Sequence, residues 1–350
     1  MRFRRRATGE PRIARLAIPG PVLDELEARG LPVAGLLEAV EHRLHEQVGS
    51  SHAFVDQAAR YLISAGGKRF RPLLVALTGH LGDPTRPELV DAAAIVELVH
   101  LATLYHDDVI DEAPARRGTP SANNRWDNTV AILTGDYLFA CASDLSAALG
   151  VEVTRIMART LARLCEGQIR EVQGSFGALP PDVPTVTPTL EHYLEVVSGK
   201  TASLIETSCR YGAMLSGVDL DGVDAAARYG WNVGMAFQLS DDVLDIASDH
   251  EDSGKTPGTD LREGVRTLPV LYALQAEPDG ELATLLAGEL SDAEVARAIS
   301  LLRAGDALDR SRQHAAAYVH AATESLTPFG DRPVVSALTR LADYALDRAG

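Results

Sequence analysis

Aromatic residues are scarce in this sequence. Phe, Trp and Tyr together make up 5% of its 350 residues, although hydrophobic residues make up 46%. Alanine and leucine fill most apolar positions instead, and both favour helices. We find no strong β-strand pattern, and no Gly/Ser-rich linker divides the chain. We therefore expect an all-α fold in one domain, although the length alone would allow two.

Cysteine is also rare, and its three positions are far apart. Cys141, Cys165 and Cys209 are odd in number and include no Cys-x-x-Cys pair. This pattern indicates reduced thiols rather than a disulfide framework or a zinc site. We expect a cytoplasmic protein.

Positive charge is in deficit. The 33 basic residues face 49 acidic ones, so the formal net charge is −16. A nucleic-acid partner is not expected, because phosphate backbones need a basic surface. A small phosphorylated substrate is still compatible, since it can bind through a metal ion and a few local cations.

Long apolar runs are missing as well. No stretch approaches the ~20 residues of a membrane span. The segment Met1–Arg6 is basic, but no apolar stretch follows it, so it does not resemble a signal peptide. We expect residues 1–34 to form a flexible basic tail, with at most a peripheral contact with an anionic membrane.

What the chain does contain is clustered carboxylates. The apolar run 101–106 ends in Asp107, Asp108 and Asp111. In a helix, Asp107 and Asp111 lie one turn apart on the same face, with Asp108 beside them. Carboxylates so close repel one another unless a cation lies between them. Mg²⁺ is suited to such a place, because it is usually held by one or two carboxylates plus substrate phosphates.

The same spacing returns later in the chain. Asp241, Asp242 and Asp245 again follow an apolar run. Either copy alone could be a solvated helix end in an acidic protein. Two copies that face each other would instead make an acidic cleft, which needs several divalent cations and an anionic ligand.

A glycine-rich loop precedes the first acidic cluster. In Ala65–Pro72, paired glycines interrupt a helix and Pro72 suits the first turn of the next one. Lys68, Arg69 and Arg71 then lie at a helix start, where backbone N–H groups and the helix dipole favour an anion. Without other context, these three could also be solvated loop cations.

These motifs, in this order, resemble the trans-prenyltransferases, the (E)-polyprenyl diphosphate synthases, from about Leu36 to the C-terminus. The resemblance implies an isoprenoid-synthase type of helical bundle over residues 35–350 and a homodimer. It also implies several Mg²⁺ ions that bridge the aspartates and a diphosphate. The segment 198–201 is not a P-loop, because the first glycine and a preceding strand are missing.

The resemblance assigns further roles. The residues that would bind isopentenyl diphosphate are Lys68, Arg71, His100 and Arg117. Arg116, Lys200 and Lys255 would contact the allylic diphosphate, while Thr201 and Gln238 would stabilise the developing cation. Arg69 matches no family position. One departure is Val265, which stands where many members have lysine; Arg266 follows it.

The implied reaction is a Mg²⁺-dependent head-to-tail (1′-4) condensation of isopentenyl diphosphate with an allylic prenyl diphosphate. Its product would be an all-trans polyprenyl diphosphate. The residues that would control product length are Ala102 and Thr103, both small, and Leu98 about a turn further from the aspartates. Because no aromatic residue stands there, we expect a long-chain product for a quinone side chain. A C15–C20 product is the alternative.

Three other functions are open from the sequence. A terpene cyclase shares the Asp-Asp-x-x-Asp helix but usually lacks the second copy, has no need of the glycine-rich cationic loop and lines its cavity with aromatics. A non-catalytic subunit of a heteromeric synthase would have lost aspartates, whereas this chain keeps all six. For a metal-dependent diphosphate hydrolase, cations for a second substrate would be superfluous.

Overall fold

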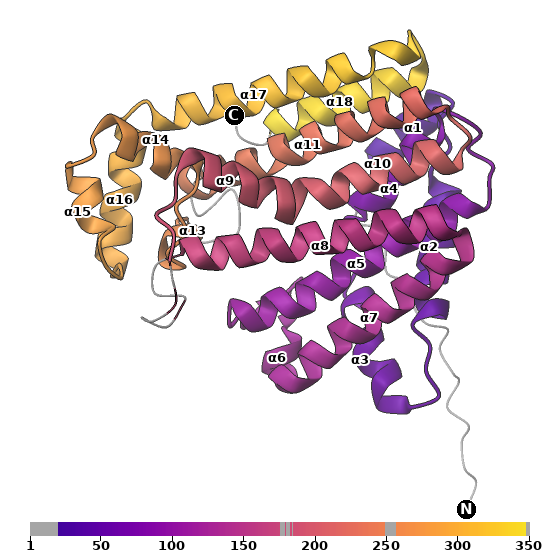
Figure 1. Cartoon of the computed structure of the whole chain (residues 1–350), viewed down its shortest axis with the longest axis horizontal. Coiled ribbons are helices and arrows are strands. Elements are labelled where there is room, and N and C mark those ends of the chain that lie inside the picture. The colour runs from indigo at the N-terminus through magenta and orange to yellow at the C-terminus, as the bar shows by residue number, and fades with distance from the viewer. Residues whose placement is uncertain (1–19, 176–178, 180–182, 184, 249–256, 348–350) are drawn as a thin grey trace, which may run out of the picture.

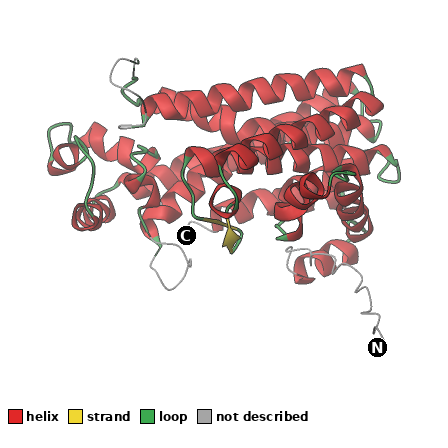
Figure 2. Ribbon diagram, turned by 90° about the horizontal axis from the view of Figure 1, so that it is seen from below, coloured by secondary structure: helices red, strands yellow, loops and turns green. Residues whose placement is uncertain are grey.

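The computed structural model describes residues 20–175, 179, 183, 185–248 and 257–347. Helices dominate this part of the chain (Figures 1 and 2), so the prediction of an all-α fold is confirmed. The N-terminal half contains α1 (Gly20–Ala28), α2 (Ala34–Gln47), α3 (Ala53–Ser64), α4 (Phe70–Gly79), α5 (Glu88–Ile110), α6 (Ala122–Arg125), α7 (Asn128–Leu149) and α8 (Val151–Gly174).

The C-terminal half continues with α9 (Leu190–Val197), a π-helical turn η1 (Ser198–Ala202), α10 (Ser203–Leu215), α11 (Leu220–Ala247), α13 (Thr259–Arg262), α14 (Leu268–Ala276), α15 (Glu281–Leu285), α16 (Asp292–Ala304), α17 (Ala307–Ser325), a 3₁₀ turn η2 (Thr327–Phe329) and α18 (Pro333–Asp347). In Figure 1, α8, α10, α11 and α17 run across the molecule, and α14, α15 and α16 gather at one end.

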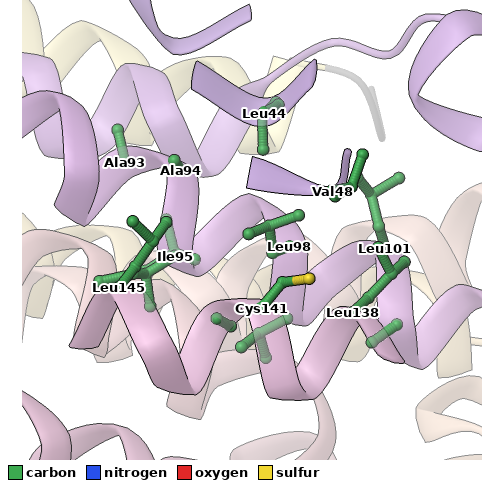
Figure 3. Close-up of a cluster of buried hydrophobic side chains, with 14 of the residues drawn as sticks. Leu44, Val48, Ala93, Ala94, Ile95, Leu98, Leu101, Leu138, Cys141 and Leu145 are labelled. Carbon is green, nitrogen blue, oxygen red and sulfur yellow. The ribbon is translucent and has the colours of Figure 1, made fainter. Parts of the chain in front are cut away.

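Helix α5 is the central element of the fold. It packs against α2, α4, α7 and α10, and nearly all of its apolar residues are buried. Figure 3 shows part of this core, where Leu98 and Leu101 of α5 meet Leu138 and Cys141 of α7. A helix that is apolar on every side is stable only when neighbours surround it, which explains the long apolar run before Asp107.

Two helices, α5 and α7, are long and apolar enough to cross a membrane by length and composition alone, contrary to our expectation from the sequence. The most apolar stretch of α5 is 67% buried inside the fold, so its hydrophobicity is explained by core packing. The corresponding stretch of α7 is only 44% buried. Part of the apolar surface of α7 therefore faces outward.

The N-terminal tail is shorter than predicted. Residues 20–28 form α1, and the side chains of Leu26, Leu31 and Val33 are buried. They pack in a cluster with residues of α4, α11 and α18. The prediction failed here because glycine and proline near this segment suggested irregular structure, while its apolar residues find partners distant in sequence. Residues 1–19 lie outside the described part.

The segment after the first acidic cluster has some regular structure of its own. Strand β1 (Ala115–Arg116) pairs antiparallel with β2 (Thr119–Pro120), and α6 follows. Arg117 and Gly118 form the tight turn, both with positive φ (52° and 73°). The hairpin places Arg116 and Arg117 beside the end of α5.

Candidate functional site

The first acidic cluster lies at the C-terminal end of α5, as predicted. Burial raises the pKa of Asp107 to about 6 and also raises the pKa of Asp111. Asp108 is fully buried, and its Oδ1 accepts a hydrogen bond from Nε of Arg116 at 2.6 Å. Its Oδ2 has no hydrogen-bond partner within the described part of the chain. These carboxylates are therefore short of positive charge.

The second acidic cluster ends α11, also as predicted. Both oxygens of Asp242 are held by protein groups: Oδ1 accepts from Nε2 of Gln238 at 2.8 Å, and Oδ2 accepts from the Tyr193 hydroxyl. Burial raises the pKa of Asp242 to about 7. Asp245 accepts the backbone N–H groups of Thr259 and Asp260, so it holds the start of α13 against α11.

A cavity of about 480 Å³ opens between the two clusters. It is lined mainly by charged and polar residues, among them Asp111, Glu171, Lys200, Thr201, Gln238, Asp242, Asp260 and Glu263. Lys200 forms an ion pair with Glu171. Burial acts to lower the pKa of Lys200, but Glu171 and Asp107 raise it above its usual value overall. Lys200 is thus a strongly held cation among the carboxylates that line the cavity.

The π-helical turn η1 carries Lys200 and Thr201. Here the helix from Leu190 crosses α8 at two glycines: a Cβ on Gly167 would lie 2.5 Å from the backbone nitrogen of Lys200, and one on Gly199 would lie 2.8 Å from the carbonyl oxygen of Arg163. Backbones can approach this closely only when both residues are glycine. This widened turn was not predicted from the sequence. Such turns are frequent at functional sites.

Thr201 and Gln238 are brought together as predicted. The Thr201 hydroxyl donates to Oε1 of Gln238 at 2.9 Å, while Nε2 of Gln238 donates to Asp242. With Tyr193 on the far side of Asp242, four side chains form one chain of hydrogen bonds. The orientation of the Gln238 amide is therefore determined by its two neighbours.

A cationic group lies on the other side of α5. Arg71 has a buried Nε without a hydrogen-bond partner among the described residues, and burial lowers its pKa to about 10. Burial lowers the pKa of His100 well below its usual value, and the positive charges of Arg71 and Arg117 lower it further. Lys68 is exposed at the edge. Four of the predicted substrate-binding residues therefore belong to one region.

The predicted chain-length residues are less close to the cavity. Thr103 lies one turn before Asp107 on the same face and is half-buried. Leu98 lies two and a half turns before it, on the opposite face, and packs against α2 and α7 (Figure 3). Its side chain therefore points away from the aspartate face, because nine residues reverse the direction of a helical side chain, and this placement gives no support to a role of Leu98 in chain length. Ala102 is fully buried.

Lys255 lies outside the described residues. Four cavity residues were missed or left without a role: Tyr193, Glu171, Asp260 and Glu263. Their partners are distant in sequence; Tyr193, for example, lies 49 residues from Asp242.

The residues fit a divalent cation that binds together with an anion. Among the described residues, no three His, Cys, Asp or Glu side chains are arranged as a ready-made metal cage. Burial nevertheless raises the pKa values of Asp107 and Asp111, so their ionised forms lack the solvation that a bound cation would replace, and Oδ2 of Asp108 has no hydrogen-bond partner among the described residues. Mg²⁺ is commonly bound in this way, with few protein ligands and substrate phosphates.

Comparison with known proteins agrees with this site. Residues 52–302 match the model of the polyprenyl synthetase family. The chain is 45% identical over 315 residues to nonaprenyl diphosphate synthase of Mycobacterium tuberculosis, covering 89% of this chain and 92% of the relative.

Solved structures give the same result. A decaprenyl diphosphate synthase from Rhodobacter capsulatus superimposes with a TM-score of 0.84 at 33% identity, covering 93% of this chain and 99% of that one. A geranylgeranyl pyrophosphate synthase from Corynebacterium glutamicum, complexed with calcium and isoprenyl diphosphate, superimposes with a TM-score of 0.79. It is 40% identical to this chain, and the match covers 93% of this chain and 98% of that one. The chain belongs to the polyprenyl synthetase family.

Proposed function

We propose that this chain, a prenyltransferase of the polyprenyl synthetase family, condenses isopentenyl diphosphate with an allylic prenyl diphosphate to give a long-chain all-trans product. The observation that carries the proposal is a carboxylate-lined cavity at the end of α5, together with a cationic group of Arg71 and Arg117 beside His100 of the same helix. Such a site suits two anionic substrates, one bound through metal and one bound directly. Similarity to nonaprenyl and decaprenyl diphosphate synthases supports the long product.

We assign the metal site to the aspartates of both clusters. Mg²⁺, when bound by Asp107 and Asp111 of α5 and by aspartates of α11, supplies the charge that stabilises a departing diphosphate. Calcium with isoprenyl diphosphate in the Corynebacterium enzyme supports a divalent cation here. Asp108 of the same cluster accepts a hydrogen bond from Arg116 through Oδ1, and its Oδ2 has no partner among the described residues.

The protein's own groups would bind and orient the substrates. Lys200 and Arg116 place positive charge where the allylic diphosphate leaves, and preorganised charge of this kind is worth more than mobile charge. Thr201 and Gln238 present side-chain oxygens to the allylic cation. Lys68, Arg71, His100 and Arg117 hold isopentenyl diphosphate, whose double bond attacks that cation. The proton then passes to the departing diphosphate, so no dedicated protein base is needed.

We also propose that two copies associate through α7 and α8. Ile132 and Leu133 of α7 are 43% and 61% exposed, and Val151 and Ile169 of α8 are 73% and 59% exposed. A large apolar face on two neighbouring helices is typical of an interface. The three free cysteines support a cytoplasmic location.

A product assay tests the proposal. Purified protein is incubated with Mg²⁺, labelled isopentenyl diphosphate and geranyl, farnesyl or geranylgeranyl diphosphate in separate reactions, and the dephosphorylated products are sized by chromatography. We expect a product well beyond C20. A product that stops at C15–C20 would favour the short-chain alternative, which the 40% identity to a geranylgeranyl pyrophosphate synthase keeps open. No elongation with any primer would contradict the proposed activity.

A further inference from the structure

Arg69 has no assigned role, although it lies between two predicted substrate-binding residues. Its side chain is 1% exposed, and its backbone adopts the left-handed conformation with a φ of 47°. Non-glycine residues rarely adopt this conformation, so the surroundings must hold it. The residue stands directly before α4, where it sets the direction in which the glycine-rich loop enters that helix.

The contacts of Arg69 come from three helices. Nε and Nη2 contact the two carboxylate oxygens of Glu41 on α2, and Nη1 donates to Glu97 on α5 at 2.8 Å. Nη2 also donates to the carbonyl oxygen of Ile63 on α3 at 3.2 Å. The planar guanidinium is thus engaged on both edges, in the two-pronged geometry that arginine forms with carboxylates.

Glu97 connects this anchor to a second arginine. Its Oε1 lies 3.8 Å from Nη2 of Arg117. Nη1 of Arg117 in turn donates to the carbonyl oxygens of Leu62 and Gly66. A Cβ on Gly67 would lie 2.8 Å from Nη1 of Arg117, so the loop backbone rests directly on this guanidinium.

The charge balance explains why two buried glutamates are needed. Lys68, Arg69, Arg71 and Arg117 gather in one region and repel one another. Glu41 and Glu97 are both buried: Glu41 pairs with Arg69, and Glu97 is shared by Arg69 and Arg117, so two negative charges balance two buried arginines. Buried charges are stable only when paired in this way. Arg71, by contrast, keeps a free Nε within the described part of the chain and can bind an anion.

We infer that Arg69, anchored by Glu41 and Glu97, is a positioning residue that holds Arg71 and Arg117 in place for the diphosphate of the non-allylic substrate. The inference rests on the proposed function. Arg69 does not touch the substrate itself. It fixes the loop at one end of the cationic region while Glu97 fixes Arg117 at the other, so loss of the anchor moves both arginines.

The test separates the two substrates kinetically. Glu97→Gln keeps the side-chain shape but removes its charge, and Arg69→Lys keeps the charge but removes the planar fork. For both variants we expect the KM for isopentenyl diphosphate to rise about tenfold or more, because small misplacements of binding groups are costly. The KM for the allylic substrate should stay within about twofold of wild type, since Lys200 and Arg116 lie outside the anchor.

Asp91→Asn is the matched control. Asp91 of α5 accepts from Nε of Arg43 on α2 at 2.6 Å, so this pair joins the same two helices without touching the cationic region. Both KM values should be unchanged in this variant. Should Glu97→Gln fail to fold, as judged by circular dichroism, Glu97→Asp replaces it, because it retains the charge and only shortens the reach; an intermediate rise is then expected.

Equal rises of both KM values, or a loss of kcat alone, would overturn the inference, because either result indicates a general structural role. Arg69→Lys kinetics equal to those of wild type would overturn it too. These outcomes require an active wild type. A wild-type chain that makes no polyprenyl diphosphate would instead overturn the proposed function, and this inference with it.

Discussion

Tyr193 donates a hydrogen bond from its phenol to Oδ2 of Asp242, and both groups are buried. Because Gln238 occupies the other oxygen, this carboxylate of the second acidic cluster is already fully engaged by the protein. Asp242 therefore orients Gln238 and, through it, Thr201.

Tyr193→Phe tests this arrangement. The change leaves Oδ2 of Asp242 buried without its donor, which costs about 1–3 kcal/mol of unfolding free energy. We expect kcat to fall about tenfold as Gln238 and Thr201 lose their alignment. The KM for isopentenyl diphosphate should not change, because its binding residues lie elsewhere. Steady-state kinetics and denaturant unfolding measure both effects, and an unaltered kcat would show that the hydrogen-bond chain is not needed.

Gly167→Ala tests the close crossing of α8 and η1. The new methyl group would lie 2.5 Å from the backbone nitrogen of Lys200, so one backbone must move. We expect a loss of about 1–3 kcal/mol in stability, as for other overpacked sites, together with lower kcat. Gly35→Ala is the control: it lies in α2 with open space around it, and alanine should stabilise that helix by about 0.5–1 kcal/mol. Urea unfolding compares the two variants.

The acidic cavity predicts an unusual pH dependence of stability. Burial raises the pKa of Asp107 to about 6 and that of Asp242 to about 7. A carboxyl group whose pKa is higher in the folded state favours folding at low pH, and that contribution is lost as the pH rises through the folded pKa. The contribution is complete below the unfolded pKa of about 4, so in EDTA the Tm of the protein should fall between about pH 4 and pH 7.

Asp107→Asn should flatten this slope, because the amide does not ionise. Mg²⁺ should raise the Tm of wild type more at the upper end of the pH range than at the lower end, since it binds the ionised carboxylates. Differential scanning calorimetry with and without Mg²⁺ measures these changes. Parallel curves of Tm against pH for wild type and the variant would contradict the assignment of Asp107 as a buried carboxyl with a raised pKa.

Product length should depend on the face of α5 that carries the substitution. Thr103 lies on the aspartate face and Ala102 lies beside it, so Thr103→Phe and Ala102→Phe should shorten the product of the elongation assay. Leu98→Phe, on the opposite face, should leave product length unchanged while reducing stability by about 1–3 kcal/mol through overpacking. Chromatographic sizing measures the chain length of the products. If all three variants make products of wild-type length, the elongating chain does not run along this part of α5.

The long helices could be predicted because their apolar periodicity is local. The apolar run before Asp107 lies in α5, and the two acidic clusters lie in the last turns of their helices. The missed features depend on distant partners. Arg69 resembled a loop cation in the sequence because Glu41 and Glu97 are each 28 residues away. Likewise, Leu31 and Val33 looked like part of a tail because the helices that cover them come much later in the chain.

The π-helical turn has a consequence for how this segment tolerates length changes. A π-turn contains one residue more than the α-helix around it, so η1 is a single-residue insertion that the helix has absorbed without a loop. Deleting one residue from 198–202 would restore an ordinary α-helix, and α9 would keep nearly the same rotation relative to α10, because the wide turn takes up the extra residue locally. Tyr193 would therefore still face Asp242, whereas Lys200 and Thr201 would lose the positions that the turn gives them, so the extra residue shapes the cavity rather than the helices around it.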